Sequence, residues 1–368
     1  MAAQFGIVLP LWSYAADRGA LLERAAGEIG LEHVTVPVVT GPQTHFRVGT
    51  APEQPHFETA GGWHFPHAAK AYAAVGIRPV RASWFAGADV LGQLREHAQR
   101  LNLKLVMRLD LRGAAVLLEQ AGHLLQRNAW GQEVTAAGGC ASQPDLRELV
   151  RATLDDLHRY EPAAWELTDW VPDLPMDRAL PRPLRWQPAA RRLVDTCFCS
   201  ACRQVAARAG VAPDQAARSV RVQVERALAG TPALTEDDPL VADYLAVRVA
   251  DCGDWLARLA QTDPLLQVVF PADEPFPYRD RVGVRPLLRV VRRTQRAEEG
   301  LAPVQADDGL SLAVWRPLFD EPADLVRTVA EGVRHGVRWF DFEQADEAPR
   351  DALTALKQAV RFARRGQP

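Results

Sequence analysis

The order of elements along the chain predicts an α/β fold: a (β/α)8 barrel of the TIM type, with long insertions after its second and fourth strands. Eight short apolar segments recur, and most are separated by stretches with helical spacing. The 368 residues exceed the ~250 typical of such a barrel and leave room for insertions. No glycine-rich turn follows the first segment, which disfavours the alternative of a doubly wound open sheet.

The expected strands are short runs rich in Val, Leu, Ile and aromatic residues. They occupy residues 5–11, 33–39, 104–111, 163–170, 265–270, 301–306, 310–315 and 337–342. The run at 33–39 is almost continuously apolar, as is typical of a strand buried on both faces. The signals at 301–306 and 310–315 are the weakest of the set.

The expected helices repeat apolar residues every three or four positions. They occupy residues 20–29, 88–101, 146–160, 189–209, 214–228, 239–259, 323–334 and 352–364. In the helix at 146–160, Pro144 and Asp145 mark the start.

Two connections are too long to be simple turns. Residues 40–69 follow the second expected strand, and residues 171–234 follow the fourth. We expect both to form walls of a binding site. The whole chain, 1–368, is interpreted as one barrel domain with a helical insertion at about 171–262.

The composition excludes several classes of protein. With 43 Lys and Arg against 46 Asp and Glu, the chain lacks the positive charge of a nucleic-acid-binding protein. No apolar stretch approaches the ~20 residues that cross a membrane, and Pro10 interrupts the first apolar run, which argues against a signal peptide. Five cysteines are too few for a secreted disulfide scaffold, so a cytoplasmic location is predicted. The oligomeric state is not indicated.

Acidic residues lie at the ends of several expected strands, where the open end of a barrel places reactive groups. Alternation along 165–170 puts Glu166 on one face and Asp169 on the other, unless a bulge brings both inward. At the last strand the same alternation turns Asp341 and Glu343 toward the barrel interior, with Glu343 nearest the opening. The expected catalytic residues are Glu166, Asp169 and Glu343.

Paired carboxyl groups at a barrel opening suit cleavage of a glycosidic bond, because one can donate a proton while the other stays ionised. Tryptophans near strand ends suit stacking on sugar rings. The expected substrate-binding residues are Trp12, Arg108, Trp170, Asp273, Trp315 and Asp341. Acids at strand ends also commonly pair with arginine, and tryptophan commonly fills a core, so a purely structural interpretation stays open.

Three cysteines lie within six residues, at Cys197, Cys199 and Cys202, and a fourth, Cys140, precedes the helix at 146–160. Four thiolates from two loops could form a tetrahedral structural zinc site. The alternative is that these are free buried thiols. Cys252 falls on the apolar face of its helix and is interpreted as core.

The histidines at 45, 56, 64 and 67 all lie in the first long insertion. Loop histidines are usually solvated, but one that reached the opening would supply an acid, a base or a hydroxyl-binding group. His33 is assigned no role. No phosphate-binding loop, dinucleotide fingerprint or serine nucleophile motif occurs, so no organic cofactor is expected.

Several short motifs together resemble bacterial glycoside-hydrolase-like barrel proteins of unassigned substrate. The carriers are Cys140-Ala-Ser-Gln-Pro-Asp-Leu-Arg147, the acid-bearing strand, Cys197-Phe-Cys-Ser-Ala-Cys-Arg203, residues 28–38, and Gly61-Gly-Trp-His-Phe-Pro66 before residues 77–80. The resemblance implies a β/α barrel, a sugar-type pocket and hydrolase activity. The chain departs from the family at Ala141 and Ser142, where Pro and Asn are usual, and at Thr168, which separates Leu167 from Asp169.

Three functions are compatible with these residues. The first is a glycoside hydrolase with Glu166 as acid/base and Glu343 or Asp169 as its partner. The second is a barrel that binds a carbohydrate or polyol without cleaving it. The third, a metal-dependent enzyme that uses the cysteines, is disfavoured because four thiolates leave no open position for water.

Overall fold

Eight parallel strands form a closed barrel in a computed structural model of the chain. The barrel strands are β1 (Gln4–Val8), β2 (His33–Thr40), β6 (Lys104–Asp110), β9 (Ala164–Thr168), β10 (Leu265–Pro271), β11 (Val284–Val290), β12 (Gly309–Ala313) and β13 (Trp339–Glu343). Each is hydrogen-bonded to its neighbours, and β1 pairs with both β2 and β13, which closes the ring. The predicted barrel is confirmed.

The structure describes residues 2–47, 53–85, 87–117, 120–170, 193–194, 196–229, 238–262, 265–271, 277–290, 305, 308–314 and 322–365.

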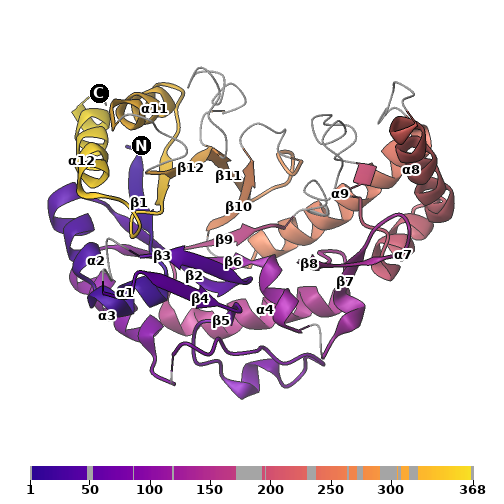
Figure 1. Ribbon diagram of the computed structural model, residues 1–368, viewed down its shortest axis with the longest axis horizontal. Coiled ribbons are helices and arrows are strands. Elements are labelled where there is room, and N and C mark those ends of the chain that lie inside the picture. Colours follow the sequence, from indigo (N-terminus) through magenta and orange to yellow (C-terminus); the bar gives the residue numbers. More distant parts are fainter. Residues whose placement is uncertain are drawn as a thin grey trace.

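The helices lie outside the ring of strands (Figure 1). They are α1 (Leu11–Asp17), α2 (Ala20–Arg24), a π-helical turn (Ala25–Ile29), α3 (Val90–Arg100), α4 (Pro144–Leu157), α7 (Ser200–Arg208), α8 (Pro213–Leu228), α9 (Pro239–Ala260), α11 (Pro322–Arg334) and α12 (Arg350–Arg365), with 3-10 turns at Ala69–Tyr72, Leu111–Leu117, Gly122–Leu124 and His158–Tyr160. In Figure 1, α1 to α3, α11 and α12 lie on one side of the barrel, and α7 to α9 lie on the other. Within the described ranges, no helix combines the length and apolar character that crossing a bilayer requires.

Two strand predictions need correction. The first strand ends at Val8, and the expected continuation to residue 11 instead turns into α1. The sixth barrel strand is Val284–Val290. It was not predicted because Pro286 and two arginines interrupt its apolar pattern. Of the segment expected in its place, 301–306, only residue 305 is described.

Insertions follow the second, third and fourth barrel strands. After β2, β3 (Gln43–Phe46) and β4 (His56–Thr59) form a hairpin, and β5 (Gly62–Trp63) adds to β2. After β6 comes an unpredicted hairpin of β7 (Leu125–Arg127) and β8 (Glu133–Gly139). The helical insertion after β9 contains α7, α8 and α9, which form a second apolar cluster around the cysteines. That the whole chain is one domain stays a prediction.

Small and aromatic residues determine how the barrel packs. The rings of Phe5 and Phe340 are buried and stack with centroids 5.1 Å apart. A Cβ at Gly332 of α11 would lie 3.0 Å from the Phe340 ring, so this glycine lets the helix pack closely on the sheet. Gly6 likewise makes room inside the barrel, because a Cβ at this position would lie 2.1 Å from the ring of His33. The absence of a side chain at Gly6 therefore gives His33 its place in the barrel.

Candidate functional site

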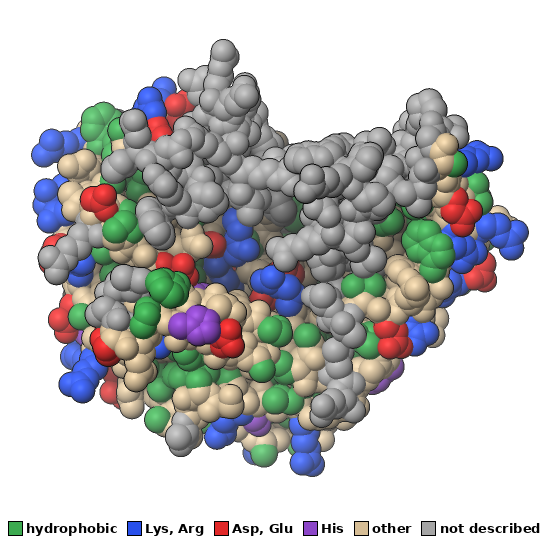
Figure 2. All heavy atoms as spheres, in the orientation of Figure 1, with side chains coloured by type: hydrophobic (Ala, Val, Ile, Leu, Met, Phe, Trp, Pro, Cys, Tyr) green, Lys and Arg blue, Asp and Glu red, His purple; other side chains and the backbone are tan. Residues whose placement is uncertain are grey.

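A cavity of about 400 Å³ lies at the C-terminal ends of the barrel strands; we call it the mouth. Its charged wall residues in the described part of the chain are Arg108, Arg112, Arg289, Asp110, Glu343, Asp346 and Glu347, with His45 from the β3–β4 hairpin. Figure 2 shows side chains of both charges gathered around the hollow near the centre of this face, beside a histidine. The mouth is the end at which barrel enzymes carry out their chemistry.

Glu343 ends β13, and one oxygen of its carboxylate accepts three hydrogen bonds. Its Oε1 accepts from Arg108 Nη1 at 2.8 Å, Arg289 Nε at 3.0 Å and Ser311 Oγ at 2.6 Å. Burial alone would raise the pKa of Glu343, but the positive charges of Arg289 and Arg108 outweigh it and lower the pKa to about 2. Glu343 is therefore held as a carboxylate at any ordinary pH.

Arg108 joins Glu343 to Glu166. Its Nε donates to Glu166 Oε2 at 2.7 Å while its Nη1 binds Glu343. Arg108 is only 5% exposed, and its buried Nη2 has no hydrogen-bond partner among the described residues. Since a buried, unpaired donor is unfavourable, this N–H is available to an oxygen that enters the mouth.

Glu166 lies below the mouth rather than in its wall. It is fully buried, and Asp341 is buried with it; the hydroxyl of Thr35 lies 3.4 Å from Glu166 and 2.6 Å from Asp341. Burial raises the pKa of Glu166 to about 8, against the opposing attraction of Arg108. Glu166 thus contacts the mouth only through Arg108.

Asp341 has three protein partners in the barrel interior. Beside Thr35, its carboxylate accepts from Trp339 Nε1 at 2.6 Å and lies 3.2 Å from His33 Nε2. Burial would raise the pKa of Asp341, but His33 and Arg108 lower it well below its usual range. Asp341 is occupied by these contacts and does not line the mouth. His33, which was assigned no role from the sequence, is a partner of this interior acid.

Asp169 follows β9 and has a left-handed backbone conformation, with φ of 55°. That turn ends the strict alternation of the strand. Asp169 therefore lies at the edge of the mouth, which we call the rim, and its Oδ2 is 2.9 Å from Nε of the lining residue Arg112. Arg112 also binds Asp110, which lines the mouth. The surrounding protein and the negative charge of Asp110 raise the pKa of Asp169 to about 6, although 43% of its side chain is exposed.

The expected sugar-stacking tryptophans are placed differently. Trp12 and Trp170 are 2% and 1% exposed. Trp12 packs among His45, Phe57, His64 and Trp84, and Trp170 stacks on Trp255 with centroids 4.5 Å apart. Neither ring has an open face for a sugar, because neighbouring aromatic side chains cover both rings. Asp273 and Trp315 lie outside the described residues.

Other mouth residues had little or no sequence signal. Arg289 belongs to the unpredicted strand β11, and Arg112 follows β6 in a 3-10 turn. His45 is the loop histidine that reaches the mouth, where its Nδ1 lies 3.0 Å from Glu347. His64 is instead buried between Thr40 and Trp84. Alternation in Val284–Val290 is the pattern that could have revealed Arg289.

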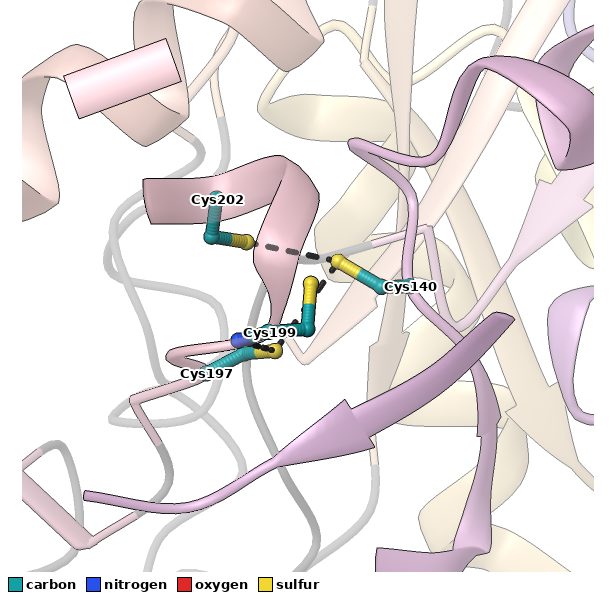
Figure 3. A group of neighbouring side chains, drawn as sticks. All are labelled: Cys140, Cys197, Cys199 and Cys202. Carbon is teal, nitrogen blue, oxygen red and sulfur yellow. Dashed lines mark hydrogen bonds between the residues drawn. The ribbon is translucent and has the colours of Figure 1, made fainter. Parts of the chain in front are cut away.

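The four cysteines expected as metal ligands converge on one point. Cys202 lies in α7, Cys197 and Cys199 lie just before it, and Cys140 approaches from the end of β8 (Figure 3). All four thiols are buried and free, and their sulfurs lie within 4.8 Å of one another. Sulfur separations of 3.4 and 3.9 Å from Cys140 approach the ~3.8 Å that a tetrahedral zinc–thiolate site requires. These residues could hold a metal ion.

Comparison with known proteins supports the fold. No family model and no curated protein sequence matches the chain. Among solved structures, the β-galactosidase from Bacillus circulans sp. alkalophilus is similar with a TM-score of 0.57 and 9% identity, over 98% of this chain and 55% of that one. The α-L-fucosidase isoenzyme 2 from Paenibacillus thiaminolyticus gives 0.57 and 12%, over 98% and 49%. The chain thus spans about half the length of two glycoside hydrolases whose barrel fold it shares.

Proposed function

We propose that the chain is a glycoside hydrolase acting at the mouth. The observation that supports this most directly is the opposite protonation tendency of two acids, Glu343 in the wall of the mouth and Asp169 beside the wall residue Arg112. The pKa of Asp169 is raised to about 6, and that of Glu343 is lowered to about 2. Cleavage of a glycosidic bond needs one carboxyl group of each kind.

In this proposal Asp169 is the general acid and Glu343 the anionic partner. The proton of Asp169 passes to the glycosidic oxygen as the bond from that oxygen to the anomeric carbon breaks. The Glu343 carboxylate stabilises the positive charge that develops on the sugar. The oxygen of a water molecule then bonds to the anomeric carbon, and the proton that the water loses passes to a carboxylate of the pair. Arg289 supports the role of Glu343, which it binds, whereas its charge lowers the pKa of Asp169 and is outweighed there by burial and by Asp110.

Arg108 and Glu166 have supporting roles in the same proposal. The free Nη2 of Arg108 would donate to a substrate hydroxyl at the base of the mouth. Glu166 is assigned as a positioning residue rather than a catalytic one, because it contacts the mouth only through Arg108. The carbohydrate would thus be held from below by a guanidinium group whose own position is set by two carboxylates.

The test is turnover of a panel of 4-nitrophenyl glycosides that includes the β-galactoside and the α-L-fucoside. Asp169→Asn and Glu343→Gln should each lower kcat by about 10²-fold or more, as removal of a general acid or a charge-stabilising group does. Binding of the uncleaved glycoside should persist in Asp169→Asn.

The matched control is Glu28→Gln, which removes an exposed carboxylate on the outer π-helical turn. It should leave kcat unchanged. Turnover that survives both mouth variants would remove these two acids from the mechanism.

One observation favours the second candidate, binding of a carbohydrate or polyol without cleavage. Every acid described in the mouth wall already has a partner: Asp110 has Arg112, Glu343 has two arginines, Asp346 has Ser13 and Glu347 has His45. A glycan that binds the wild-type protein, with no turnover of any glycoside in the panel, would decide for this function.

We also propose that the four cysteines hold a structural zinc ion. Four buried thiols at tetrahedral spacing match the ligand set of structural zinc and leave no position for a reacting water. Such an ion would link the β7–β8 hairpin to α7. The proposed chemistry at the mouth does not use it.

A further inference from the structure

A second cavity lies at the opposite end of the barrel. Its volume is about 370 Å³, and residues at the N-terminal ends of several strands line it, including Gln4 of β1, Lys104 of β6 and Trp339 of β13. The mouth is lined by the other ends of β6 and β13, at Asp110 and Glu343. We call this second space the N-terminal cavity.

The described wall of the N-terminal cavity has positive charges and no acid. Lys104, Arg285 and Arg338 contribute to it, and none of its described lining residues is Asp or Glu. Two acids next to lining residues are already engaged: Asp308, beside Gly309, is 3.0 Å from Arg279, and Asp341, which accepts from the indole N–H of Trp339, is fully buried against His33 and Thr35. The wall of the N-terminal cavity therefore differs from that of the mouth, which contains both arginines and acids.

A buried polar group also faces this space. Gln267 of β10 lines the cavity and is only 2% exposed, yet its Oε1 has no hydrogen-bond partner in the part of the chain that the structure describes. It lies in register with Arg285 on the neighbouring strand β11. A buried carbonyl oxygen without a donor is unfavourable, so a donor from within the cavity would satisfy it.

From these features we propose a second binding site in the N-terminal cavity, for a small anion that also carries a hydroxyl group. The oxyanion contacts Lys104 and Arg285, and the hydroxyl donates to Gln267 Oε1. The ammonium group of Lys104 has three N–H donors and makes one described hydrogen bond, to Gln4 at 3.1 Å, so donors remain for the oxyanion. Phosphorylated and carboxylated polyols share this chemistry. The site is independent of the proposed hydrolase activity.

Isothermal titration calorimetry on the whole protein tests the proposal with three probes of similar size: glycerol 3-phosphate, glycerate and glycerol. One or both anions should bind, and glycerol should not. Comparison of the two anions then distinguishes a phosphate from a carboxylate ligand. Raising the salt concentration should weaken binding, because exposed charges contribute to it.

Lys104→Gln and Arg285→Gln should each weaken anion binding about tenfold, as loss of a charge-assisted hydrogen bond does. Both side chains are exposed, so neither change should affect folding. Gln267→Glu places a negative charge against the anion and should abolish binding. Arg334→Gln removes an exposed charge on α11 and should have no effect.

Three outcomes would overturn the proposal. The first is that neither anion binds at millimolar concentration. The second is that binding is unchanged in both Lys104→Gln and Arg285→Gln. The third is that Arg112→Gln, at the mouth, weakens binding as much as Arg285→Gln, which would place the anion at the other end of the barrel.

Discussion

The cysteine cluster and the mouth differ in how far apart in the chain their residues lie. Three of the four cysteines come from six consecutive residues at the start of α7. The mouth instead draws Arg108, Thr168, Arg289 and Glu343 from four strands spread over more than half of the sequence. The cysteine cluster is assembled largely by local chain geometry, whereas the mouth forms only once the barrel has closed.

The two regions also differ in how charge is balanced. At the mouth each buried carboxylate has an arginine, a histidine or a hydroxyl beside it, so the protein itself supplies the compensation. The cysteine cluster instead has four buried thiols and one buried arginine, Arg248, whose charge acts on Cys202. Four thiolates would carry more negative charge than one arginine offsets, so the proposed zinc ion would balance the cluster, whereas side chains balance the mouth.

Removal of a cysteine should have the largest effect on stability. Cys202→Ala would take one of four ligands from the proposed zinc ion, and we expect loss of about one zinc per chain with on the order of 5 kcal/mol of the free energy of unfolding. Elemental analysis and urea unfolding measure the two quantities. Cys252→Ala, which removes a buried thiol outside the cluster, should keep the metal. Equal metal content in the two variants would contradict the zinc assignment.

Loss of Arg108 should come next. Arg108→Met leaves Glu166 and Glu343 without their shared cation in a buried setting, which should cost about 3–5 kcal/mol in unfolding free energy. Arg112→Met is the matched change at the rim, where the side chain is 45% exposed, and should cost about 1 kcal/mol or less. Similar losses in the two variants would mean that burial does not distinguish these arginines.

The same contrast explains what the sequence could predict. Spacing alone predicts that Cys197, Cys199 and Cys202 lie together, since six residues of one segment cannot place their thiols far apart, whereas Cys140 was only a candidate fourth ligand whose approach depends on the fold. Glu343 was also found, because alternation in β13 and the rule that barrels react at strand ends both apply there. These signals are local, and the structure preserves them.

What the sequence could not predict depends on several strands at once. Arg289 lies in a strand that was not predicted because Pro286 interrupts its apolar pattern. The position of Asp169 at the rim follows from a left-handed backbone conformation that no sequence pattern indicated. The burial of Trp12 depends on aromatic residues of the insertion after β2. Partners brought together by the closed barrel cannot be paired before the barrel is known.

The smallest predicted effect, and the one that addresses the mouth most directly, is the pH dependence of glycoside hydrolysis. Asp169 must be protonated to act as the acid, and its raised pKa is about 6; Glu343 must be ionised, and its pKa is about 2. Activity should therefore be highest between these values, and kcat/KM should fall about tenfold per pH unit above pH 6.

Asp110→Asn sharpens this prediction because the negative charge of Asp110 is one cause of the raised pKa of Asp169. Its removal also frees Arg112 to act on Asp169 alone, and both changes lower the pKa of that acid. The alkaline limb of the kcat/KM profile should then move to lower pH. If the limb stays in place, a group other than Asp169 supplies the proton, and the rim pair has no part in the chemistry of the mouth.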